Sequence, residues 1–219
     1  MRRSALALGF LYASLLFCAQ VNPAHARAPR AVVRIATGQV SINGKPAFAG
    51  DAVTDGALLE TGKGSFCVII FDQKNTIAVS ADTRVTLALA GKEKALDIAK
   101  GAVASLVRGL ARISGGTAYA YTVKTPTAIC GVRGTAFFVK VESPKKTYVC
   151  LCNGSLELSA ASGGKVEQLT ANHHKAFWVT EKGASIIISS ALPDFHTDGE
   201  MESLATVIGE TMDWSKPER

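Results

Sequence analysis

From Val32 to Val123 the sequence is a succession of short β-strand patterns, and this feature limits the possible folds most. Runs rich in Val, Ile, Leu, Thr and aromatic residues recur about every ten residues, separated by Gly, Asn and Asp. Val85, Leu87 and Leu89 alternate with smaller or polar residues, which is the period of a strand with one buried face. No helical pattern separates the strands, so a doubly wound parallel sheet is excluded. We predict a single all-β domain, built as a sandwich, an open barrel or a twisted solenoid-like sheet.

Only the C-terminal tail changes to a helical period. Thr197 and Glu200 have the spacing of a capping box, and Met201 and Leu204 follow at helical intervals. We predict a short amphipathic helix over about 198–212, packed on the sheet or on a partner.

The first 26 residues have the pattern of a signal peptide. Two arginines precede an apolar stretch over residues 5–19, and Ala24 and Ala26 supply small residues for cleavage. An uncleaved N-terminal anchor is the alternative. We predict a periplasmic or secreted protein.

Cleavage after residue 26 would leave about 190 residues, enough for one domain and a short tail. We predict an all-β domain over 31–190 and a tail with the amphipathic helix over 191–219. The formal charge would fall from +6 to +4 with the loss of Arg2 and Arg3. This net charge is small, and the lysines and arginines are scattered along the sequence rather than clustered. Together with the export signal, this argues against nucleic acid as a partner. No later apolar run is long enough to cross a bilayer.

Residues 125–139 and the following Asn153-Gly154 pair carry the strongest turn signals. Glycines spaced among β-branched and aromatic residues predict tight corners between strands. Asn-Gly favours a two-residue hairpin turn. Such a turn would place Cys150 and Cys152 on one polar face with Ser155 and Glu157, opposite the leucines of the core.

The four cysteines beyond the signal peptide allow three interpretations: structural disulfides, free thiols or metal ligands. They are Cys67, Cys130, Cys150 and Cys152. An even number in an oxidising compartment favours disulfides. A bridge between Cys150 and Cys152 is disfavoured, because residues i and i+2 of a strand lie about 6.6 Å apart with parallel side chains.

Two thiolates from Cys150 and Cys152 would also suit a zinc or copper ion. We expect His174 and His196 to complete such a site, with His173 as the alternative to His174. His173 and His174 are neighbours on a predicted strand, so only one of them can point at the cysteines. The C-terminal region would have to fold over the cysteine face.

Several segments in the order in which they occur make the chain resemble a FecR-type periplasmic domain over about residues 32–158. These segments are Gly38-Gln-Val-Ser-Ile42, Ala49-Gly-Asp-Ala-Val53, Leu58-Leu-Glu-Thr-Gly62, Val68-Ile-Ile-Phe-Asp72, Lys100-Gly-Ala-Val103, Val123-Lys-Thr-Pro-Thr-Ala-Ile-Cys-Gly-Val-Arg-Gly-Thr-Ala-Phe-Phe-Val139 and Thr147-Tyr-Val-Cys-Leu-Cys-Asn-Gly-Ser-Leu156.

The resemblance implies a non-enzymatic all-β module whose best-known relatives carry an uptake signal from an outer-membrane receptor to a cytoplasmic sigma factor. Those relatives begin with a cytoplasmic anti-sigma segment and a membrane span, whereas a signal peptide is predicted here. We therefore expect a stand-alone periplasmic binding, scaffold or sensor module that meets a protein partner at the envelope and requires no cofactor. A metal-binding or thiol-based sensor is the alternative.

Thr125, Pro126, Arg133 and Gly134 lie in the segment most like the family. The Arg133 guanidinium would either bind an anionic partner or satisfy turn carbonyls. No nucleophile motif or phosphate-binding glycine loop is present, so we predict that the protein is not an enzyme.

Overall fold

The computed structural model describes residues 31–108 and 120–217. The predicted signal peptide lies outside the described residues. Within the described part, no helix combines the length and the hydropathy that a membrane span requires.

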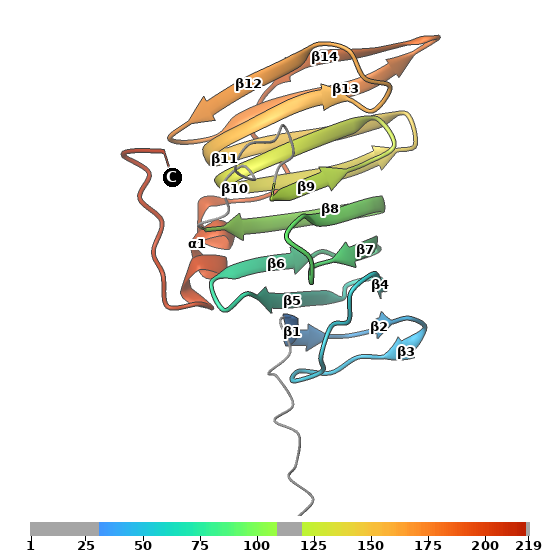
Figure 1. Cartoon of the computed structure of the whole chain (residues 1–219), viewed down its shortest axis with the longest axis vertical. Coiled ribbons are helices and arrows are strands. Elements are labelled where there is room, and N and C mark those ends of the chain that lie inside the picture. Colours follow the sequence, from blue (N-terminus) through green and yellow to red (C-terminus); the bar gives the residue numbers. More distant parts are fainter. Residues whose placement is uncertain (1–30, 109–119, 218–219) are drawn as a thin grey trace, which may run out of the picture.

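The protein is an open, mostly antiparallel sheet with one short C-terminal helix, which confirms the predicted all-β class. The strands are β1 (Ala31–Thr37), β2 (Val40–Ile42), β3 (Lys45–Pro46), β4 (Ala57–Thr61), β5 (Phe66–Phe71), β6 (Asn75–Val79), β7 (Arg84–Ala88), β8 (Lys94–Val107), β9 (Tyr121–Lys124), β10 (Ala128–Ser143), β11 (Lys146–Ala160), β12 (Val166–Ala171), β13 (Lys175–Lys182) and β14 (Ser185–Ala191). The helix α1 spans Asp198–Thr206. In Figure 1 the strands follow one another along the long axis, from β1–β3 to β12–β14.

The sheet is folded into two layers, because three long strands each belong to both. The first half of β8 pairs with β7 and β9, and its second half pairs with β6 and β10. Likewise, β11 pairs with β13 through its first part and with β12 through its second. Layer A contains β2, β3, β4, β7, β9 and β12, and layer B contains β1, β5, β6, β13 and β14, each with its share of the long strands.

The main core lies between the two layers. Phe71 and Phe137 of layer B both contact Tyr121 of layer A, with ring centroids 5.7 and 6.1 Å apart. All three side chains are fully buried. Alternate residues of each strand supply the remaining apolar contacts, as the strand period requires.

The sequence contains two Asn-Gly pairs, and only the first forms a turn. Asn43 and Gly44, both with positive φ, join β2 to β3 as a two-residue hairpin. The hairpin predicted at Asn153-Gly154 is wrong. These residues lie inside the continuous strand β11, and the chain reverses instead at Pro144-Lys145.

Gly154 marks the place where β11 passes from layer B to layer A. Its φ is +109°, and it pairs with Thr135 beside a register shift in β10. A Cβ at this position would lie 2.2 Å from the carbonyl oxygen of Gly134. Glycine is therefore required here for close contact between strands rather than for a hairpin.

A second apolar cluster covers the outer face of layer B. Met201, Leu204 and Ala205 of α1 are buried against this face, where Phe138 also lies. Figure 1 shows α1 beside β6 and β8, the two strands whose contacts with it are most extensive. The predicted capping box is confirmed, because Thr197 accepts from the Glu200 amide and the Glu200 carboxylate accepts from the Thr197 amide. The helix ends about six residues earlier than predicted.

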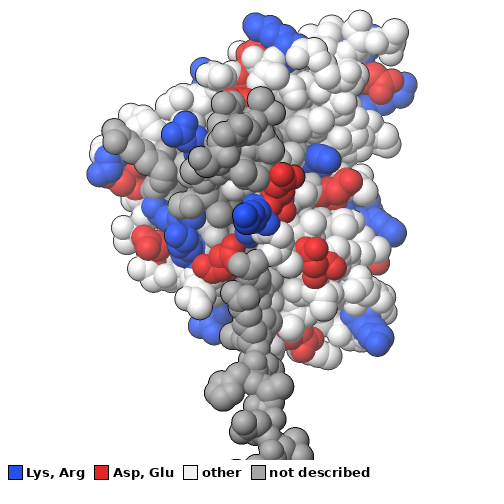
Figure 2. Space-filling view, viewed as in Figure 1, with Lys and Arg blue, Asp and Glu red and all other residues white. Residues whose placement is uncertain are grey.

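Charged side chains of both signs are interspersed on the face shown in Figure 2. The described residues form several ion pairs at the surface, such as Arg84 with Glu60 at 2.9 Å. On this face the charges are as scattered as the sequence indicated.

Candidate metal centre

Strand alternation places Cys150 and Cys152 on the same side of β11. Val149 and Leu151 point into the main core, so the two cysteines point to the opposite, outer face of layer B, together with Tyr148. Both cysteines are completely buried. The prediction that they share a face separate from the core leucines is correct, although the face is apolar and covered rather than open and polar.

The two remaining donors come from separate segments that meet on this face. His174 ends the turn between β12 and β13, and its backbone amide donates to the carbonyl of Cys152 at 3.0 Å. His196 lies in the C-terminal segment just before α1, and its ring stacks on Phe138 with centroids 4.6 Å apart. The backbone has a positive φ at or next to each histidine. It is +28° at His174 and +68° at Phe195, the residue before His196. Residues held in this region are often found at functional sites.

The four donor atoms lie close enough to share one ion. Nδ1 of His174 is 3.5 Å from Sγ of Cys150, and Nε2 of His196 is 3.2 Å from Sγ of Cys152. All four atoms lie within 4.8 Å of one another. Tetrahedral zinc with its usual bond lengths to sulfur and nitrogen separates these ligand atoms by about 3.5 Å. The chain therefore holds the donor set near ligand geometry.

The second nitrogen of each histidine ring also has a fixed partner. Nε2 of His174 lies 2.6 Å from a carboxylate oxygen of Asp198, and Nδ1 of His196 lies 2.9 Å from the carbonyl oxygen of Asp194. When these nitrogens carry the protons, Nδ1 of His174 and Nε2 of His196 are left as lone-pair donors facing the thiols. Metal-bound histidines in proteins almost always have such outer partners.

The site is closed. The His174 side chain is only 10% exposed. The ring of Trp214 packs against His174 with a centroid separation of 5.6 Å, and its indole nitrogen donates to Glu202 of α1 at 2.9 Å. Four protein ligands without an open position are typical of a structural metal site rather than a catalytic one.

The electrostatics favour a thiolate at one of the two cysteines. Hydrogen bonds from Cys152 above all, and then from His174 and His196, lower the pKa of Cys150. Burial, and next the neighbouring Cys150, raise the pKa of Cys152. The pKa of His174 is raised, mainly by its hydrogen bond to Cys150. The lowered pKa of Cys150 favours its thiolate, the form that binds a soft metal ion.

His173 and the other two cysteines are not members of this donor set, although His173 forms a second, more exposed group with His174 and Asp198. His173 is in the turn before β13 rather than on a strand, and its Nε2 lies 3.0 Å from Asp198. Of the two neighbouring histidines, His174 is thus the one that faces the cysteines. Cys67 and Cys130 are buried in the main core, and no disulfide joins the four described cysteines.

The sequence does not predict Asp198 as an outer partner, because its spacing only indicates the start of a helix. An acidic residue in the first helical turn is common for dipole reasons alone. The nearby His196 two residues earlier was the only signal, and it is a weak one.

Comparison with known proteins finds one family match. A model of the FecR protein family matches residues 57–157, from β4 into β11. This part of the chain is therefore similar to a FecR domain. The match includes Cys150 and Cys152 but ends before His174 and His196, so the candidate centre joins the FecR domain to the segments that follow it.

Solved structures also resemble part of the chain. Two crystal structures of a candidate anti-sigma factor from Parabacteroides distasonis each show 18% identity and a TM-score of 0.47, covering 61% of this chain and 59% of that one. The chain thus spans about three-fifths of the length of that protein. No curated protein matches the chain.

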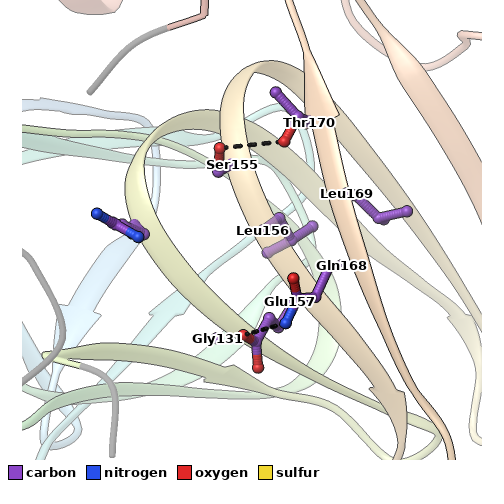
Figure 3. A pocket seen from close by; sticks show the side chains of 8 residues that line it. Gly131, Ser155, Leu156, Glu157, Gln168, Leu169 and Thr170 are labelled. Atoms are coloured by element: carbon purple, nitrogen blue, oxygen red, sulfur yellow. Dashed lines mark hydrogen bonds between the residues drawn. The ribbon is translucent and has the colours of Figure 1, made fainter.

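The other predicted site residues of the FecR domain lie away from the metal centre. Arg133 is exposed and lines a shallow pocket of about 310 Å³ across β10, β11 and β12. Figure 3 shows this pocket, where Ser155 and Thr170 are hydrogen-bonded across β11 and β12. Among the described residues the Arg133 side chain makes no hydrogen bond to a turn carbonyl, and its binding to an anionic partner stays a prediction. Gly134, with a φ of +52°, lies where β10 changes layer.

Thr125 and Pro126 begin a buried hydrogen-bond network. Thr125 closes the turn around Pro126, accepting from the amide of Ala128 at 2.9 Å, and its hydroxyl also meets Thr147 at 3.0 Å. Thr127 donates to the Thr147 hydroxyl at 2.7 Å and lies 3.1 Å from the carbonyl of Val179. The segment thus ties β10 to β11 and β13.

Replacing Thr127 by Val should lower the free energy of unfolding by about 1–3 kcal/mol, because it leaves buried acceptors without their donor. Urea unfolding measures the loss. Thr86→Val on the exposed side of β7 is the control and should change stability little. A loss at Thr127 no larger than at Thr86 would contradict the structural role.

Proposed function

We propose that this protein is a non-enzymatic, metal-binding regulatory module of the cell envelope that acts through a protein partner. The observation that carries the proposal is the meeting of Cys150, Cys152, His174 and His196 within 4.8 Å of one another. Two buried thiols, two imidazoles and anchored outer nitrogens are the arrangement that a tetrahedral soft-metal site needs.

The ion that fits is Zn²⁺ or Cu⁺. Both accept mixed sulfur and nitrogen ligands in low-coordinate geometry, and thiolates select them over Mg²⁺ or Ca²⁺. The closed ligand sphere leaves no position for a substrate. The metal would therefore support structure and sensing rather than catalysis.

The FecR domain supports the regulatory part of the proposal, since a FecR match points to a signalling or sensor module. We place the protein in the periplasm, because its first residues have a signal-peptide pattern and because the resemblance implies an envelope location. In that compartment a bound metal also protects the cysteines from oxidation.

Elemental analysis and thiol counting test the metal directly. Protein purified without chelator from the periplasm should carry about one zinc or copper ion per chain, and four thiols should react after denaturation and metal removal. Metal-free protein that takes up neither Zn²⁺ nor Cu⁺ in the presence of a reductant would overturn the proposal.

Single variants assign the ligands. With Co²⁺ as a spectroscopic probe, Cys150→Ser and Cys152→Ser should each remove the sulfur-to-metal absorption band of their thiolate and weaken binding strongly. His174→Ala should weaken binding as well. Thr86→Ala on the exposed side of β7 is the control and should leave the spectrum and the affinity unchanged, because Thr86 belongs to neither group of potential metal ligands.

Asp198→Asn should weaken metal binding by about 10–100-fold, the usual cost of losing an outer carboxylate partner of a ligand histidine. The amide is nearly isosteric with the carboxylate but does not favour the Nε2 proton of His174 to the same degree. Competition with a chromophoric chelator measures the affinity. An unchanged affinity would show that Asp198 does not position His174.

The proposed binding to a protein partner is tested with the same variants. An envelope protein that the metal-loaded chain captures, and that the Cys150→Ser variant does not, would be a metal-dependent partner. Equal capture by both would separate partner binding from the metal and favour a scaffold that needs no ion.

A further inference from the structure

The C-terminal segment after β14 crosses the outer face of layer B, and the candidate centre lies where it does so (Figure 1). Three of the four donors, Cys150, Cys152 and His174, belong to the sheet and its turns. His196 is the only donor that the segment itself supplies. Two residues later Asp198, the first residue of α1, lies 2.6 Å from His174. A ligand and an outer partner therefore flank the N-cap of the helix.

The helix is weakly held by its other contacts. It has nine residues, fewer than the roughly 12–15 that an isolated helix needs to be even marginally stable. Only three of its side chains are buried. A cavity of about 320 Å³ lies between the helix and the sheet, and Phe66 at its lining is 37% exposed. Apolar packing beneath α1 is therefore incomplete.

The contacts on either side of the helix limit which part of the segment can move. The Tyr148 hydroxyl donates to the Leu192 carbonyl and accepts from the Asp194 amide. On the other side, the Asn153 side chain donates to the carbonyls of Asp213 and Lys216. Between these two fixed points, the centre holds the start of α1, and a hydrogen bond from the Arg108 side chain to the Thr211 carbonyl at 3.0 Å holds the segment after the helix.

We infer that the metal ion holds helix α1 on the outer face of layer B, and that loss of the ion frees residues 195–212 and uncovers that face. This inference rests on the proposed metal binding and adds its structural consequence. Bound metal would link His196 to both Cys150 and Cys152 of β11, whereas in its absence the segment keeps only hydrogen bonds and partial packing. The covered and uncovered faces are the two states that a partner would distinguish.

Hydrogen exchange of the full chain tests the inference. The samples are the Zn²⁺-loaded protein, the metal-free protein with reductant, and the His196→Ala variant at saturating Zn²⁺. Amides of α1 should exchange at least about tenfold faster without metal, whereas those of β5 and β6 should not change, because only the helix opens locally. His196→Ala keeps the three sheet ligands, so it should bind Zn²⁺ and still show faster exchange in α1. Thr86→Ala on the exposed side of β7 should behave as the unaltered protein.

Metal uptake is measured on the same samples. Faster exchange in α1 of both the metal-free protein and the Zn²⁺-bound His196→Ala variant supports the inference. If Zn²⁺ binds but α1 exchanges equally with and without it, the inference is overturned and the proposed metal binding stands. If Zn²⁺ does not bind at all, the proposed function fails and the inference fails with it.

Discussion

Zinc-loaded protein should unfold about 8–16 °C above the metal-free protein when free Zn²⁺ is about 1,000 times its dissociation constant. A ligand that binds only the folded state at this excess stabilises it by about 4 kcal/mol. Each kcal/mol moves the melting temperature of a domain of this size by about 2–4 °C. Calorimetry in the presence of a reductant, with and without chelator, measures the difference.

The Cys150→Ser variant is the control for this shift. Loss of a buried thiol changes the stability of the metal-free chain, so the informative quantity is the difference between zinc and chelator for each protein. That difference should nearly disappear in the variant. A zinc shift of equal size in both proteins would mean that the ion binds elsewhere.

Gly154→Ala should lower the free energy of unfolding by more than about 3 kcal/mol, since strained backbone and a steric clash act together. The new Cβ would lie 2.2 Å from the carbonyl oxygen of Gly134 and 2.9 Å from Cα of Thr135. Both are backbone atoms, so no flexible side chain can move away. Denaturant unfolding gives the loss.

Gly163→Ala separates the clash from the backbone strain. Gly163 also has a positive φ, of +85°, but no atom lies within 4 Å of its added Cβ. Its substitution should cost only about 1–2 kcal/mol, the cost of a left-handed conformation for a residue with a side chain. Equal losses at the two positions would refute the close contact between β10 and β11.

Local patterns in the sequence were sufficient for the strands and the helix. Val85, Leu87 and Leu89 alternate into the core as expected, and Thr197 caps α1 as its spacing indicated. The preference of Asn-Gly for a hairpin turn gave a wrong prediction at Asn153-Gly154. There the pairing of β11 with β10 along its whole length outweighs this local preference.

The donor set was also proposed from the sequence, on chemistry and an assumed folding of the tail. The approach of His196 to Cys152 joins residues 44 positions apart, and no local pattern specifies such a contact. The roles of Asp198 and Trp214 likewise depend on where the tail crosses the sheet. These long-range placements follow from packing against the whole domain, which spacing alone does not describe.

The sharing of β8, β10 and β11 between the two layers has a consequence for folding. Neither layer is a separable unit, since removing any one of these strands takes material from both. The strands also pair across long stretches of sequence, as β10 does with β8, and non-local antiparallel pairing of this kind folds slowly, in milliseconds to seconds. A nascent chain that has not yet released β11 from the ribosome lacks a strand of each layer and both cysteines. Both layers of the sheet and the pair Cys150 and Cys152 can therefore be completed only after β11 has been synthesised.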